Sequence, residues 1–151
     1  MDLIDKKILT LLQENAKQNT KEIAAKVGLT VSPTFERIKK LEEQNYIKGY
    51  VAVLNPIMIQ KTISVFCQIS LATHSKESLE NFKSEISKIK EVMSCHHMSG
   101  NYDFLLKVVV SDIKEYQYFA TEKLPRIGGI SNVQSSFVIQ EISNNNAYHL
   151  E

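Results

Sequence analysis

Residues 20–49 have the sequence TKEIAAKVGLTVSPTFERIKKLEEQNYIKG, which predicts two short amphipathic helices joined by a tight turn. The first helix is expected to begin at Thr20, its N-cap, and to stop at Gly28, because glycine tolerates a left-handed backbone. Thr30 is the expected N-cap of the second helix, and Pro33 falls in the first turn, where its missing amide hydrogen has no partner to lose. This spacing is typical of a helix-turn-helix.

The second helix is expected to reach about Gln44 and to carry a buried side and a polar side. The side predicted to be buried consists of Val31, Phe35, Ile38 and Leu41. The polar side has hydroxyl groups near the helix start and cations farther along, which suits base edges and phosphates of a DNA groove. The predicted DNA contacts are Ser32, Thr34, Glu36, Arg37, Lys39 and Lys40. A solvated charged face is the alternative, but the helix-turn-helix spacing favours DNA.

The segments on either side complete a winged helix-turn-helix. Upstream, Asp2 is the expected cap of a helix with apolar residues at helical spacing, namely Ile4, Ile8, Leu11 and Leu12. Downstream, Asn45 is expected to close the recognition helix in the left-handed conformation. The sequence YIKGYVAVLNP, residues 46–56, then predicts a turn and a strand, the wing. We therefore expect the DNA-binding domain over residues 1–50 and a strand and linker over residues 51–62.

The rest of the chain, residues 63–151, predicts a second domain. Expected strands cover residues 63–71, 92–98, 104–110 and 130–142, and expected helices cover 75–90 and 112–123. The second helix is predicted to open with an Asp112-x-x-Glu115 capping box and to end at Pro125 and Gly128-Gly129.

The resulting order β-α-β-β-α-β is that of the ferredoxin-like fold, an α+β fold with two helices on one face of a four-stranded antiparallel sheet. The third strand, FLLKVVV, is apolar on both sides. We therefore expect the other face of the sheet to be covered by the same sheet of a second subunit, giving a homodimer.

Composition and charge restrict the class of protein. The chain has 151 residues, 43% hydrophobic content and no long apolar run, as expected for one medium or two small globular domains. Residues 1–61 hold ten Lys or Arg and seven Asp or Glu, whereas residues 62–151 hold eight and ten. The mild basic excess agrees with a nucleic-acid module beside a neutral one. Because Met1 leads directly into a capped helix without a signal-peptide core, we expect a cytoplasmic protein without a membrane anchor.

No residue pattern indicates catalysis, a cofactor or a metal. A P-loop, a dinucleotide fingerprint and a nucleophile elbow are all missing from the sequence. His96 and His97 are adjacent in a predicted strand and therefore point to opposite faces, which disfavours a shared metal ion. Cys67 and Cys95, also in predicted strands, are expected to be reduced, buried apolar filler.

Over nearly its whole length the chain resembles the Lrp/AsnC, or feast/famine, regulators. The resemblance rests on LIDKKILTLLQENAKQNTKEIAAKVGLTVSPTFERIKKLEEQNYIKGY at residues 3–50, HHMSGNYDFLLKVVV at 96–110 and LPRIGGISNVQSSFVIQEI at 124–142. It implies a transcription regulator, not an enzyme, that binds double-stranded DNA and responds to a small amino acid. It also implies dimers that assemble into a higher oligomer, an octamer, with the effector held between dimers.

The effector site implied by this resemblance is centred on the turn before the third strand. Backbone amides of Ser99, Gly100, Asn101 and Tyr102 are expected to hold the effector's carboxylate, and Asp103 its amino group. Ser135 and Ser136 are expected to contribute hydroxyl groups from a neighbouring strand or subunit. An ordinary hairpin turn is the alternative from the residues alone.

Proteins that resemble this family in both domains also act as sirohaem decarboxylases, which use histidine and arginine near the tetrapyrrole. His96 and His97 keep this enzyme as an alternative. The cationic recognition helix weighs against it, because a decarboxylase has no need of one.

Overall fold

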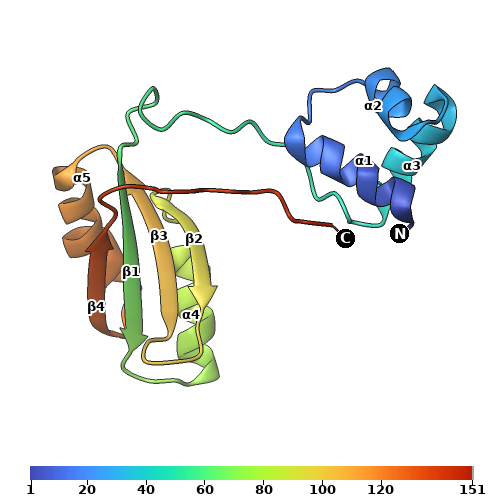
Figure 1. The fold of residues 1–151 in the computed structure, drawn as a ribbon. Coiled ribbons are helices and arrows are strands. Elements are labelled where there is room, and N and C mark those ends of the chain that lie inside the picture. Colours follow the sequence, from blue (N-terminus) through green and yellow to red (C-terminus); the bar gives the residue numbers. More distant parts are fainter. Residues whose placement is uncertain (151) are drawn as a thin grey trace. The chain divides into compact units, whose positions relative to one another are not determined.

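The computed structural model describes residues 1–150 and divides the chain into two compact units (Figure 1). One unit comprises Met1–Val53 together with the C-terminal segment from Ile142, and the other comprises Leu54–Glu141. The C-terminal segment is tied to the first unit by Gln13, whose side-chain amide donates to the Tyr148 carbonyl at 3.1 Å and accepts from the Tyr148 amide at 2.6 Å. None of the helices within residues 1–150 is long and apolar enough to cross a bilayer.

The first unit contains the three expected helices, α1 (Leu3–Glu14), α2 (Thr20–Val27) and α3 (Val31–Glu43). They enclose a small core formed by Ile8, Leu12, Ile23 and Leu41. Each helix contributes at least one of these side chains, so the core holds all three helices together.

The helix ends follow the predicted chemistry with one correction. Asp2 caps α1 as predicted, in a reciprocal capping box with Asp5. The N-cap of α2 is Asn19 and not the predicted Thr20, because the Asn19 side chain accepts from the Glu22 amide at 2.9 Å. Gly28, with φ of 74°, ends α2 in the predicted left-handed conformation. Asn45, with φ of 59°, does the same just beyond α3.

The prediction of a strand that ends at Asn55-Pro56, the wing, is wrong. Within residues 44–62, all of which the structure describes, the backbone forms turns and irregular segments but no strand. Val51 and Val53 are 86% and 82% exposed. A strand requires a partner for its backbone groups, and the described chain places none beside this segment.

The second unit has the predicted ferredoxin-like fold. Its elements are β1 (Ile63–Leu71), α4 (Lys76–Ile86), β2 (Val92–His97), β3 (Phe104–Val110), α5 (Ile113–Tyr118) and β4 (Ile130–Phe137). The strands form one antiparallel sheet in the order β2-β3-β1-β4. β3 has the predicted bounds, whereas β4 ends five residues before the predicted Ile142.

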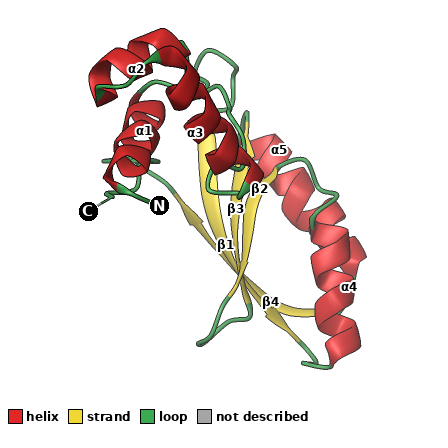
Figure 2. Cartoon of the chain, turned by 90° about the vertical axis from the view of Figure 1, so that its right-hand side faces the viewer, coloured by secondary structure: helices red, strands yellow, loops and turns green. Residues whose placement is uncertain are grey.

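The main core lies between the sheet and its helices, which cover one face (Figure 2). Alternate residues of β3, namely Phe104, Leu106, Val108 and Val110, are buried on this face. The Phe104 ring stacks on Phe82 of α4 with centroids 4.4 Å apart. On the opposite face, Leu105 and Val109 are half-buried and Phe66 of β1 is 38% exposed.

The helical segment after β3 is a regular α-helix only in its first part. α5 is followed by a π-helical turn, Phe119–Lys123, and a 3₁₀ turn, Leu124–Ile127. Pro125 was predicted to end the helix, but it lies in the first turn of the 3₁₀ segment, where its missing amide hydrogen is tolerated. Gly128 and Gly129, both with positive φ, end the segment as predicted.

The start of α5 is held by Glu115. Asp112 accepts from the Glu115 amide as predicted, but the Glu115 carboxylate accepts from the amide and hydroxyl of Ser111 instead of completing a capping box. Lys61, just before β1, lies 2.9 Å from the same carboxylate. The Ser111 hydrogen bonds, followed by the Lys61 contact, lower the pKa of Glu115 from its usual 4.5 to about 2.

This shift predicts an acid-sensitive contribution to stability. Because the folded carboxylate has the lower pKa, the unfolded chain binds more protons between about pH 4.5 and pH 2, and stability falls as the pH drops through that window. Replacement of Glu115 by Gln (E115Q) should lower the free energy of unfolding near neutral pH, with a deficit that shrinks toward pH 2. Urea unfolding of the full chain, followed by circular dichroism at several pH values, measures the free energy of unfolding of the wild type and the variant.

Lys61→Gln provides the matched comparison. It leaves the Ser111 donors, which are the larger cause of the shift, and should keep most of the pH dependence. A constant deficit of Glu115→Gln at every pH would contradict the prediction.

Candidate functional site

The turn between α2 and α3 sets the geometry of the helix-turn-helix. The Leu29 amide donates to the Ala24 carbonyl at 3.0 Å, so the chain closes α2 before it turns. Thr30 follows in an extended conformation as the N-cap of α3, although its side chain makes no capping hydrogen bond. α3 therefore starts where the sequence predicts, at Val31.

The buried side of α3 is rotated relative to the prediction. Leu41 is buried as expected, but Val31 and Phe35, predicted to be buried, are 47% and 53% exposed. The predicted DNA contact Thr34 is fully buried, and its hydroxyl donates to the Thr30 carbonyl at 2.9 Å. Thr34 and Leu41 are seven residues apart and therefore lie on one side of the helix. The outward placement of Thr34 was wrong because Thr34 shares the buried side of the helix with Leu41, and Phe35, one residue farther on, is turned away from it by about 100°.

The remaining predicted DNA contacts divide into two groups. Exposed side chains of α3 include Ser32, Glu36, Lys39 and Lys40. The Lys39 ammonium group lies 3.7 Å from Glu43 on the same helix, a solvent-exposed pair that water and salt weaken. These four residues form what we call the outer face of α3, and they are available to a partner of the first unit.

Arg37 is directed toward α1 instead. Its Nη1 atom lies 2.7 Å from a carboxylate oxygen of Asp2 and 2.7 Å from one of Asp5. The Asp5 amide and then the Arg37 guanidinium lower the pKa of the Asp2 carboxyl. Arg37 thus joins the capped start of α1 to α3, a role that the sequence pattern does not reveal because Asp2 and Asp5 are distant in the chain.

The predicted effector turn lies between β2 and β3. Ser99, Gly100 and Asn101 are exposed, and Tyr102 is half-buried. The Met98 amide donates to the Asp103 carbonyl at 2.8 Å and closes the turn. The three exposed residues thus lie in the turn at one end of the sheet.

Asp103 is held at the end of β1. Its amide donates to the Ile69 carbonyl at 2.8 Å, and its Oδ2 atom accepts from the Leu71 amide at 2.7 Å. Its Oδ1 atom lies 2.8 Å from Nε2 of His74, and the side chain of Asp103 is only 16% exposed. The carboxylate is therefore fixed in position and directed at the loop that leaves β1.

Ser135 and Ser136 do not lie with this turn. The two serines pair with Cys67 and Phe66 of β1, whereas the turn lies beside Ile69 and Leu71. Adjacent residues of a strand point to opposite faces, so the two serines cannot line one site in a single chain. Ser135 accepts a hydrogen bond from Tyr116 of α5 on the helix-covered face.

The histidines and cysteines do not form a metal site. His97 stacks on Phe104 with ring centroids 4.9 Å apart, and the register places His96 on the other face. No cluster of three His, Cys, Asp or Glu side chains occurs in the part of the chain that the structure describes. Cys67 is buried as predicted, but Cys95 is exposed because β2 is an edge strand.

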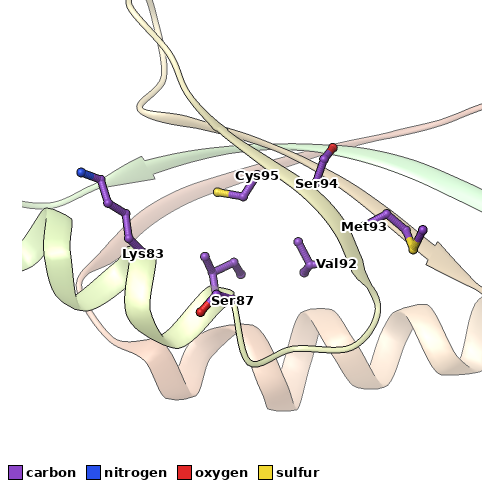
Figure 3. Close-up of a pocket in the computed structure, with 7 residues that line it drawn as sticks. Lys83, Ser87, Val92, Met93, Ser94 and Cys95 are labelled. Carbon is purple, nitrogen blue, oxygen red and sulfur yellow. The ribbon is translucent and has the colours of Figure 1, made fainter. Parts of the chain in front are cut away.

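Two hollows lie away from the effector turn. One, with a volume of about 340 Å³, lies between the end of α4, with Lys83 and Ser87, and the strand residues Val92 to Cys95 (Figure 3). The other, with a volume of about 430 Å³, lies in the first unit and includes Phe35, Lys39 and Tyr50. Neither is lined by a residue of the predicted effector set.

Two models of known protein families match this chain, one in each unit. Residues 1–48 match the model of a winged helix-turn-helix DNA-binding domain, and residues 64–148 match that of the Lrp/AsnC ligand binding domain. Together the two matches cover nearly the whole chain.

Known proteins of similar sequence are regulators. The chain is 35% identical to the leucine-responsive regulatory protein of Klebsiella pneumoniae over 97% of this chain and 89% of that protein. It is 37% identical to the Bkd operon transcriptional regulator of Pseudomonas aeruginosa over 94% and 93% of the two chains.

Solved structures of similar fold agree. A transcriptional regulator from Neisseria meningitidis, solved as a complex with L-Met, superposes with a TM-score of 0.94 at 32% identity, over 99% of this chain and 96% of that one. An AsnC family transcriptional regulator from Agrobacterium tumefaciens also has a TM-score of 0.94, at 37% identity and 99% and 97% coverage.

Proposed function

The chain belongs to the Lrp/AsnC family of transcriptional regulators, and from this we propose how its own residues contact DNA and an effector. The outer face of α3 enters the major groove of duplex DNA. The turn at residues 99–103 binds a small amino acid, whose binding changes the assembly or the spacing of the DNA-binding units.

The observation that carries the DNA proposal is the exposure of one side of α3. Ser32, Glu36, Lys39 and Lys40 are all exposed, while Thr34 and Leu41 are buried on the opposite side of the helix. Polar groups near the start of such a helix reach base edges, and cations farther along meet phosphates. Val31 and Phe35 add exposed apolar surface beside them, which suits the methyl groups of thymine.

The effector proposal rests on the fixed carboxylate of Asp103 beside exposed backbone amides. A free α-amino acid carries an ammonium and a carboxylate group, and these two kinds of protein group complement it. The L-Met complex of the Neisseria meningitidis regulator supports the same class of ligand here. Ser135 and Ser136 enter this site only if another subunit supplies them, since the two serines are remote from the turn of their own chain.

We extend the proposal to a homodimer that assembles further, as an octamer. Its support is the face of the sheet opposite the helices, where Phe66, Leu105 and Val109 leave apolar surface in part uncovered. The sirohaem decarboxylase alternative receives no support, because the relatives are named as regulators and His96 and His97 lie on opposite faces.

The DNA proposal is tested by salt dependence. Lys40→Ala should weaken binding to a labelled duplex and reduce the slope of log K against log salt concentration by about one, because each phosphate contact releases condensed counterions. Fluorescence anisotropy at several salt concentrations gives the slope.

Arg37→Ala is the matched control, since its charge is directed at Asp2 and Asp5. It should weaken binding through a loosened first unit and leave the slope unchanged. An equal loss of slope in both variants would place Arg37 against a phosphate and contradict our assignment.

The effector proposal is tested by titration calorimetry with each of the twenty common amino acids. Asp103→Asn should weaken binding of the preferred amino acid by about 10- to 100-fold, because it removes the charge that pairs with the ammonium group. The variant keeps an oxygen for the Leu71 amide and should therefore keep its DNA affinity. Unchanged effector affinity would refute the assignment of Asp103.

The oligomer proposal is tested by sedimentation equilibrium at micromolar concentration. The wild-type chain, of 17.2 kDa, should have at least twice this mass. Leu105→Glu should lower the mass, because it buries a charge in the proposed interface. Met93→Glu is the control, at an edge-strand residue that is 68% exposed. A monomeric wild-type protein would disprove the proposal.

A further inference from the structure

The carboxylate of Asp103 already has a partner on each oxygen. Oδ2 accepts from the Leu71 amide at 2.7 Å, and Oδ1 lies 2.8 Å from Nε2 of His74. The Asp103 side chain is 16% exposed, whereas the His74 side chain is 67% exposed. The imidazole thus occupies the carboxylate oxygen that the Leu71 amide leaves free.

The Leu71 amide and the His74 imidazole differ in how readily each can release the Asp103 carboxylate. The Leu71 amide belongs to β1, and the main chain of Asp103 is bound to the same strand through the Ile69 carbonyl. Releasing it would open the end of the sheet. His74 lies in the loop between β1 and α4, and its exposed side chain rotates without breaking a backbone hydrogen bond.

The loop itself is held on both sides of His74. The Thr73 hydroxyl is 2.9 Å from the Ser78 hydroxyl, and the Ser75 hydroxyl accepts from the Ser78 amide at 3.1 Å as the N-cap of α4. A change at His74 is therefore confined to the side chain.

We propose that His74 is an internal competitor that occupies the position of the effector's ammonium group on Asp103. This inference rests on the proposed effector function and deepens it. An imidazole N–H and an ammonium N–H are donors of the same kind, and with Oδ2 bound to the Leu71 amide both have to reach Oδ1 of a carboxylate that is 16% exposed. An α-amino acid binds by displacing His74, so part of its binding free energy is lost in breaking the His74–Asp103 contact.

A positioning role for His74 makes the opposite prediction. If the imidazole orients Asp103 for the effector, its removal weakens binding. The sign of the change in effector affinity therefore distinguishes the two roles.

The test is calorimetry of the full-length chain with the amino acid that the wild type binds best among the twenty common ones. His74→Ala should bind it roughly two- to fivefold more tightly, because the effector no longer has to break the His74–Asp103 hydrogen bond. His74→Gln keeps a donor without the imidazole and should fall between the wild type and His74→Ala. His149→Ala, at an exposed histidine of the C-terminal segment, should match the wild type.

The outcomes separate this inference from the function on which it rests. Equal or weaker binding by His74→Ala, together with weaker binding by Asp103→Asn, overturns only the competitor role of His74. Binding that Asp103→Asn leaves unchanged overturns both the site and the competitor. The absence of heat with every amino acid, for the wild type and His74→Ala alike, overturns the effector function and the competitor together. Thermal unfolding of each variant without ligand verifies that it is folded.

Discussion

The angular position of α3 about its own axis is the constraint on which the DNA-binding unit depends. It is determined by the burial of Thr34 and Leu41 on one side and by the contacts of Arg37 with Asp2 and Asp5. A rotation by one residue, about 100°, would bury Phe35 and expose Thr34. The same constraint decides which polar groups remain for DNA, because Ser32, Glu36 and Lys39 are outward only in the observed position.

In the second unit, the candidate effector site depends on β1, one of the two inner strands of the sheet. This strand pairs with β3 and β4, carries four fully or nearly fully buried side chains, and ends where Asp103 binds the Leu71 amide. The candidate effector site is thus attached to an inner strand of the sheet, while His74, on its other side, lies in a short exposed loop. An acceptor anchored to the sheet beside an exposed side chain is an arrangement through which a ligand alters local contacts without unfolding the domain.

Periodicity and capping residues predicted most of the fold because they act over a few residues. The apolar run FLLKVVV predicted β3 with its bounds, and the glycine and asparagine at positions 28 and 45 predicted left-handed helix ends. The turn between β2 and β3 was predicted as well. Errors arose where a distant partner decides: residues 51–55 have strand-like side chains but no neighbouring strand, and Cys95 is exposed because β2 is at the edge of the sheet.

The amino-acid sequence by itself determined the order of the helices and of the four sheet strands, and the family, because hydrophobic period, caps and turn residues are local properties of the chain. Only the tertiary structure decided the rotation of α3, the engagement of Arg37 with α1, the separation of Ser135 and Ser136 from the effector turn, and the contact of His74 with Asp103. Each of these depends on which distant side chains fit together in the packed state. Such a fit depends on the volumes and orientations of side chains in three dimensions. Residue type and spacing in the sequence do not specify these.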